Sequence, residues 1–68
     1  MSSTQTYTVT GMTCGHCVAS VTEEVQEIAG VEDVAVDLAS GAVTVTSAEP
    51  LDETAVRAAV EEAGYQLG

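Results

Sequence analysis

The chain has 68 residues and a formal net charge of −10, because eleven carboxylates stand against a single arginine, Arg57, and no lysine. A chain of this length forms one domain at most and buries only about 60% of the surface that its unfolded state exposes. Phosphate backbones and anionic membranes would repel such a surface, so the composition disfavours nucleic-acid partners and membrane insertion. The acidic surface serves either solubility or the docking of a partner, and composition leaves both interpretations open.

The N-terminal segment, MSSTQTYTVT, has neither a basic region nor an apolar run, and no stretch of the chain approaches membrane-spanning length. We therefore expect a cytoplasmic protein, in a compartment where thiols stay reduced. A disulfide between the only two cysteines, Cys14 and Cys17, would close a four-residue loop and remove little entropy from the unfolded chain. Both cysteines are thus expected to bind metal or to react rather than to staple the fold.

Hydrophobic periodicity predicts a strand and then a helix in the first thirty residues. From Gln5 to Thr10, Tyr7 and Val9 alternate with threonines, which is typical of a half-buried strand. The segment VASVTEEVQEIAG then places apolar residues at helical spacing, and Gly30 is expected to end this helix at its C′ position. The apolar stripe comprises Val18, Val21, Val25 and Ile28.

The middle of the chain, VEDVAVDLASGAVTVT, predicts a β-hairpin whose connection is Ala39-Ser40-Gly41. Apolar and polar residues alternate on both sides of that connection, as expected for two half-buried strands. The apolar positions are Val34, Val36 and Leu38 before the turn and Val43 and Val45 after it.

The last third of the chain predicts a second helix and a short strand. Asp52 is positioned to cap the helix, with Glu53 in its first turn, and Gly64 is expected to end it. Residues 65–67 are long enough for a final strand. The buried helix face comprises Val56, Ala59, Val60 and Ala63.

The expected element order over residues 1–68, taken as a single domain, is β-α-β-β-α-β. Two βαβ halves in this order predict a ferredoxin-like α+β sandwich, a four-stranded antiparallel sheet with two helices on one face. The other sheet face would remain solvated, which agrees with the threonines of the predicted strands.

The segment GMTCGHC holds both cysteines and the only histidine. Cys14 is expected in the loop after the first strand and Cys17 near the first turn of the helix, where the positive helix end favours thiolate over thiol. Thiolates select soft metals, but structural zinc normally takes four protein ligands, and this segment offers three candidates at most. A site with two thiolates suits Cu(I), or Hg(II) by the same softness argument, and its openness favours passing the metal on.

The GMTCGHC motif, the βαββαβ order and the terminal EEAGY resemble the heavy-metal-associated domain family, and among its members the small bacterial cytoplasmic copper chaperones. The resemblance covers nearly the whole chain. It implies a carrier rather than an enzyme, which binds Cu(I) through Cys14 and Cys17 and delivers it to the metal-binding domains of a copper-transporting P-type ATPase. It also implies that loaded copies can form a copper-bridged homodimer.

Five further residues are expected to tune the site without forming its main ligand pair. His16 lies between the cysteines and is read either as a third ligand, whose titration would couple copper affinity to pH, or, preferably, as an exposed imidazole that only tunes local charge. Met12 has a thioether, but the resemblance places it in the core as an anchor of the loop. Tyr65 is expected beside the metal loop, where it shields the site or hydrogen-bonds near a sulfur. Thr13 and Gly15 complete the set.

Two other functions fit parts of the sequence. A CxxC segment before a helix is also found in thiol–disulfide oxidoreductases, although those chains are longer and their site follows a central parallel strand. The same fold could also carry mercury, zinc or cadmium. A detached metal-binding domain of an ATPase is a third possibility, which the Met start makes less attractive than a free-standing protein.

Overall fold

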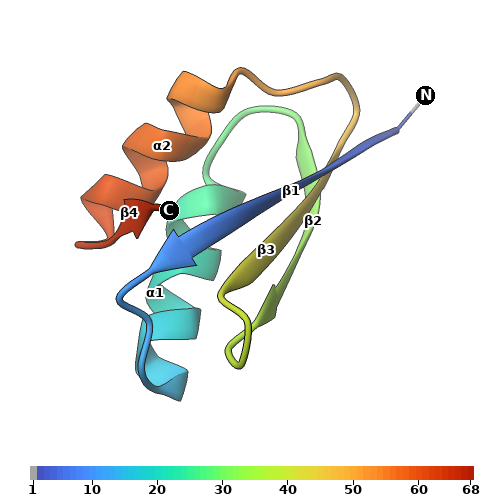
Figure 1. The fold of residues 1–68 in the computed structure, drawn as a ribbon. Coiled ribbons are helices and arrows are strands. Elements are labelled where there is room, and N and C mark those ends of the chain that lie inside the picture. Colours follow the sequence, from blue (N-terminus) through green and yellow to red (C-terminus); the bar gives the residue numbers. More distant parts are fainter. Residues whose placement is uncertain (1) are drawn as a thin grey trace.

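The computed structural model describes residues 2–68, and within them the elements follow the predicted order (Figure 1). The elements are β1 (Ser3–Thr10), α1 (Gly15–Gln26), β2 (Val31–Asp37), β3 (Ala42–Ser47), α2 (Glu53–Glu62) and β4 (Gln66–Leu67). The strands form one antiparallel sheet in the order β2-β3-β1-β4, and both helices cover the same face of it. The predicted ferredoxin-like sandwich is therefore confirmed. Across residues 2–68, neither helix has the length and apolar composition needed to cross a bilayer.

The core lies between the helices and the inner face of the sheet, and it is built almost entirely from valine. Strand alternation sends Val9, Val43 and Val45 to this face, while the neighbouring threonines of β1 and β3 face outward. The helices contribute Val21, Val25, Val56 and Val60, all with no exposed surface. Burying one such side chain stabilises the fold by about 1.5–3 kcal/mol relative to leaving it in water.

The end of α1 differs from the prediction. The helix ends at Gln26. Its C-cap is Glu27, which lies three residues before Gly30, the expected C′ residue. Beyond it, short turns carry the chain onward, since the Ile28 N–H donates to the Val25 carbonyl and the Val31 N–H donates to the Ile28 carbonyl. Gly30, with a φ of +90°, shapes the turn into β2 rather than ending the helix. Ile28 still packs against the core, which explains why the apolar spacing overshot the helix.

The hairpin between β2 and β3 turns one residue earlier than predicted. Leu38 was expected on the buried face, but it lies in the turn with 39% of its surface exposed, so that prediction was wrong. The Gly41 N–H donates to the Asp37 carbonyl at 2.8 Å, and Gly41 adopts a φ of +75°. Its lack of a side chain also matters for packing, because a Cβ here would lie 2.7 Å from the Val9 carbonyl oxygen.

Both ends of α2 are closed as the sequence indicates. The Asp52 carboxylate accepts a hydrogen bond from the Thr54 N–H at 3.0 Å, which caps the N-terminus. At the other end, the Gly64 N–H donates to the Glu61 carbonyl and the Tyr65 N–H donates to the Val60 carbonyl. This pair of bonds, with Gly64 at a φ of +94°, is a Schellman motif. It sets the direction in which the chain leaves α2.

Candidate metal centre

The GMTCGHC segment connects β1 to α1 at one end of the sandwich. The strand ends at Thr10, and Gly11 turns the chain with a φ of +91°. Cys14 is the N-cap of α1, and its carbonyl accepts hydrogen bonds from the N–H groups of Cys17 and Val18. The first turn of the helix therefore holds both cysteines in one short stretch of backbone, as the sequence predicted.

The two thiols face each other but differ in exposure. Their Sγ atoms lie 3.1 Å apart, within contact distance of a sulfur hydrogen bond, and both cysteines are free thiols. Cys14 is exposed, whereas Cys17 is buried with 9% of its surface accessible. One sulfur is thus reachable from outside, and the other is held within the fold.

Cys17 is the more acidic thiol of the pair. Its pKa is lowered from an ordinary value of 9.0 to about 6, first by a hydrogen bond from the Tyr65 side chain and then by backbone and side-chain hydrogen bonds from Thr13 and Cys14. These donors favour the charged form and outweigh the opposing effect of desolvation. At neutral pH the Cys17 sulfur is therefore a thiolate, the form that binds metal.

Tyr65 reaches this loop from the far end of the chain. The Schellman motif places it three residues beyond the end of α2, and its ring lies against the loop, with Cδ1 3.4 Å from where a Cβ on Gly11 would stand. Its interaction with Cys17, then desolvation and the nearby sulfur charge, raise the pKa of Tyr65. The hydroxyl thus remains protonated beside the thiolate.

The other predicted residues surround the cysteine pair in different ways. His16, Thr13 and Gly15 are exposed on the loop and the first turn of α1. Met12 is partly buried and packs against the valine core. Over residues 2–68, no group of three or more histidine, cysteine or acidic side chains is arranged to hold a metal ion, so the sulfur pair stands without a third such ligand.

One functional residue, Gly11, was missing from the predicted set. A side chain there would be strained by the positive φ, and its Cβ would lie in van der Waals contact with the Tyr65 ring, 3.4 Å away. The signal available in the sequence was a glycine directly after a strand, which often marks a close approach of backbone to another group.

A ferredoxin-like sandwich with two thiols at the start of its first helix defines a small metal-binding domain. The heavy-metal-associated domain family matches residues 6–66, and the chain belongs to this family. The COP-associated protein of Helicobacter felis is 42% identical over 60 residues, which cover 88% of this chain and 91% of that protein. The copper chaperone CopZ of Enterococcus hirae is 40% identical over 63 residues, with 91% of each chain covered.

Similar sequences also occur inside much larger proteins. Copper-transporting ATPase 1 of Rhizobium meliloti is 38% identical over 63 residues, which cover 93% of this chain but only 8% of the ATPase. Among solved structures, a CopZ metallochaperone superposes with a TM-score of 0.90 at 31% identity, covering 97% of this chain and all of that chain. The fold is therefore shared by free-standing chains and by single domains of transporters.

Proposed function

We propose that this protein is a copper chaperone, a cytoplasmic carrier rather than an enzyme, which binds one Cu(I) ion between Cys14 and Cys17. It passes the ion to the metal-binding domains of a copper-transporting P-type ATPase. The observation that carries the proposal is the sulfur pair at the start of α1, 3.1 Å apart, with one thiol exposed and the other acidic. Soft thiolates prefer Cu(I) over hard cations. The names of two similar proteins, a copper chaperone and a copper-transporting ATPase, support copper as the cargo.

Loading requires the two sulfurs to move apart. If copper–sulfur bonds have a length of about 2.3 Å, as zinc–sulfur bonds do, a linear site separates the sulfurs by about 4.6 Å. The observed separation is 3.1 Å. Cys14 is exposed and its side chain makes no capping bond to the helix, so its sulfur is the one free to swing outward. X-ray absorption of the loaded protein should report two sulfur ligands in near-linear geometry.

The difference in exposure between Cys14 and Cys17 also sets the order of steps in copper transfer. A thiolate of the partner attacks the bound Cu(I) from the exposed side and forms a third copper–sulfur bond, after which the Cys14–copper bond breaks. A second partner thiolate then replaces Cys17, whose sulfur stays a thiolate, and Cys14 takes up a proton from solvent. Copper stays Cu(I) throughout, so no electron donor or acceptor is needed. The similar stretch within a copper-transporting ATPase supports a transfer between two domains of the same family.

Anaerobic Cu(I) titration against a chromophoric chelator tests the site. We expect one Cu(I) per chain, and loss of tight binding in both Cys14→Ser and Cys17→Ser, with Ser20→Ala, on the exposed outer face of α1, as a matched control. Unchanged affinity in either cysteine variant would contradict a two-thiolate site. His16→Ala, titrated across pH, separates an exposed tuning residue from a ligand, because only loss of a ligand lowers affinity at every pH.

The same protein distinguishes the remaining functions. Efficient turnover in a disulfide reductase assay together with feeble copper binding would favour a redox protein, and preference for Hg(II), Zn(II) or Cd(II) in competition would favour another cargo. Transfer to a purified ATPase metal-binding domain is expected to proceed without dissociation of free copper. Size measurement at rising copper-to-protein ratios tests whether loaded copies pair through a shared ion, which would require both cysteines.

A further inference from the structure

The two outer edges of the sheet are protected to different degrees. At one edge, β2 carries Glu32, Asp33 and Asp37, and its register with β3 is interrupted between Val31 and Asp33. Charged side chains and irregularities of this kind prevent an edge strand from pairing with another chain. At the other edge, β4 contributes only two residues, so it covers only part of β1.

The N-terminal half of β1 is consequently an open edge. Strand β4 pairs with Val9 and Thr10, and the Gly68 N–H donates to the Thr8 carbonyl. Because backbone groups of alternate residues point to the same side of a strand, those of Thr4 and Thr6 face the same side as those of Thr8. Within residues 2–68, no backbone partner meets Thr4 or Thr6 on that side.

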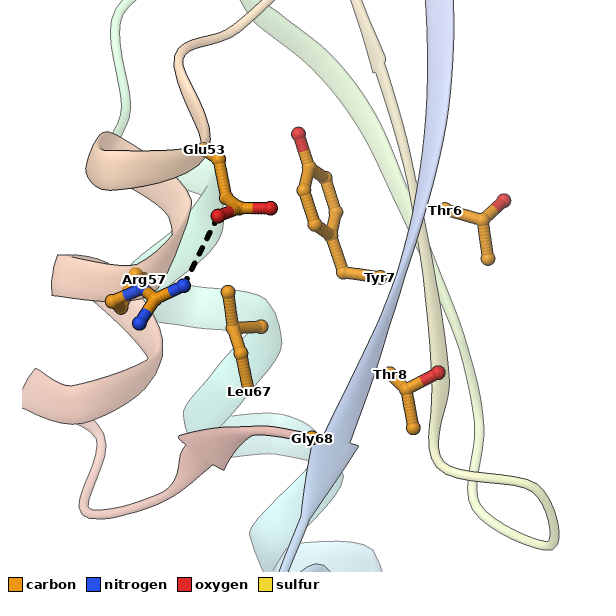
Figure 2. A pocket seen from close by; sticks show the side chains of 7 residues that line it. All are labelled: Thr6, Tyr7, Thr8, Glu53, Arg57, Leu67 and Gly68. Atoms are coloured by element: carbon orange, nitrogen blue, oxygen red, sulfur yellow. Dashed lines mark hydrogen bonds and ion pairs between the residues drawn. The ribbon is translucent and has the colours of Figure 1, made fainter.

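A pocket of about 220 Å³ lies beside Leu67 and Gly68, between β1 and the first turns of α2. Figure 2 shows Tyr7 and Leu67 projecting from β1 and β4 toward α2, where Glu53 and Arg57 form the rim. The Tyr7 hydroxyl is buried and meets no hydrogen-bond partner among residues 2–68. Desolvation, followed by the charges of Glu53 and Asp52, raises the pKa of Tyr7, so this hydroxyl remains a donor. The pocket thus offers unused polar groups beside an unused strand edge.

The strand at this edge is uncharged. Residues 2–8 carry no charged side chain. The chain has no lysine, and its single arginine, Arg57, lies at the rim of the pocket. Its guanidinium lies 3.0 Å from the Glu53 carboxylate, and both side chains are more than half exposed. Two copies with ten net negative charges each repel at long range, but the strands that would meet here are uncharged, and Arg57 gives each copy one cation at the rim beside Glu53 and Asp52.

We propose that this edge is a self-association surface, on which β1 of a second copy pairs antiparallel with β1 in a metal-independent dimer. Around a two-fold axis, the Thr4 and Thr6 backbone groups of each copy bond to those of the other, and Gln5 faces Gln5. The α2 helices then lie on the same side of the joined sheet, where Arg57 of each copy can pair with Glu53 of the other. Both metal loops stay free, because they follow the opposite ends of the paired strands.

The dimer is expected to be weak. Few backbone bonds cross the axis, and the total charge of the two copies is large. Salt should therefore strengthen association, because it screens the long-range repulsion more than the short contacts at the edge. Salt would weaken an interface held mainly by attraction between opposite charges, so the direction of the salt effect distinguishes it from the proposed interface.

The test uses metal-free, reduced protein with a copper chelator present, so its outcome is separate from that of the copper proposal. Sedimentation and NMR dilution series from micromolar to millimolar concentration should show a reversible dimer that salt favours. Amide shifts and hydrogen-exchange protection at Thr4 and Thr6 should grow with concentration. The amide of Asp33, at the opposite edge, is the internal control and should not change.

Two sets of variants test the interface directly. Thr6→Pro removes the outward N–H, which the edge of a sheet tolerates, and should abolish the dimer, whereas Thr6→Val keeps that N–H and should retain it. If Thr6→Pro fails to fold, Arg57→Glu replaces it: this change should weaken association at least tenfold. The swap Glu53→Arg with Arg57→Glu should restore association.

Three results would overturn the proposal. The protein could stay monomeric at millimolar concentration in high salt, or Thr6→Pro and Thr6→Val could associate equally. The concentration-dependent shifts could also fall on Gly11–Cys17 or on the outer threonine face of the sheet instead of on the open edge of β1.

Discussion

The Tyr65 side chain, three residues beyond the end of α2, lies beside Cys17 in the first turn of α1. This contact is the largest cause of the low pKa of Cys17. It depends on backbone geometry at both ends: a Schellman motif directs Tyr65, and Gly11, with a φ of +91°, turns the chain from β1 into the cysteine loop. The chemical state of the buried sulfur is thus set by a residue near the opposite end of the chain.

Replacing Tyr65 with Phe should raise the pKa of Cys17 well above about 6, toward its ordinary value of 9.0, because the main donor to the thiolate is lost. Ultraviolet absorbance of the thiolate, followed against pH in metal-free protein, measures the first ionisation. Tyr7→Phe is the matched control, since Tyr7 is not among the causes of the Cys17 shift. An unchanged midpoint in Tyr65→Phe would show that the backbone donors alone set the acidity.

Gly64→Ala should disturb both stability and the site. The φ of +94° at Gly64 costs an alanine about 1–2 kcal/mol, and any adjustment of the turn displaces Tyr65. Gly15→Ala is the control, because a methyl group on Gly15 would meet no neighbour within 4 Å and Gly15 lies in ordinary helical backbone. Urea unfolding should separate the two variants, and the Cys17 midpoint should rise only in Gly64→Ala. A Gly64→Ala protein with wild-type stability would argue against the Schellman motif.

The stability of the metal-free, reduced protein should increase as pH rises from about 6 toward 9. Cys17 loses its proton near pH 6 in the folded state but only near its ordinary value when unfolded, so the unfolded state binds more protons between these limits. The gain is fully present above the unfolded pKa and is lost as pH falls through about 6. Urea unfolding across this range should show the increase in wild type and a flatter profile in Cys17→Ser. Parallel profiles would contradict a folded-state thiolate.

Val60→Ala should destabilise the fold by about 2–3 kcal/mol, because it removes two buried methyl groups from a site with no exposed surface and leaves a cavity. Leu38→Ala removes more atoms from the hairpin turn, yet it should lower the free energy of unfolding by less than Val60→Ala does. Leu38 is 39% exposed, whereas Val60 has no exposed surface, so truncation at the turn opens to solvent and leaves no closed cavity. Equal effects in urea unfolding would mean that Leu38 packs more tightly than the structure indicates.

Much of this fold could be predicted from valine and threonine spacing. Alternation located β1 and β3, and the helical stripe correctly included Val21, Val25, Val56 and Val60. The errors arose at apolar residues that continue the spacing of a helix or strand beyond the point where that element ends. Ile28 contacts the core from beyond α1, and Leu38 continues an alternation that the turn has already ended.

The candidate site was predictable in part. The exposure of Cys14 and the burial of Cys17 follow from their places before and within the first turn of α1, and Tyr65 was expected beside the loop. Its role as main donor to Cys17, and the need for Gly11, could not be predicted, because both depend on the path by which α2 returns to the loop. The spacing of residues along the chain does not show how closely the end of α2 approaches the cysteine loop in the fold.

The two helices begin in contrasting ways, and the difference carries a cost. Asp52 caps α2 through its side chain, whereas Cys14 occupies the same position in α1 and makes no such bond, with no acidic residue in the first turn. A conventional cap contributes about 1 kcal/mol, which this chain forgoes at the one helix end that would have to open toward a partner. Cys14→Asp should therefore give a more stable fold that has lost an exposed sulfur, so stability and the proposed delivery of copper favour different residues at this position.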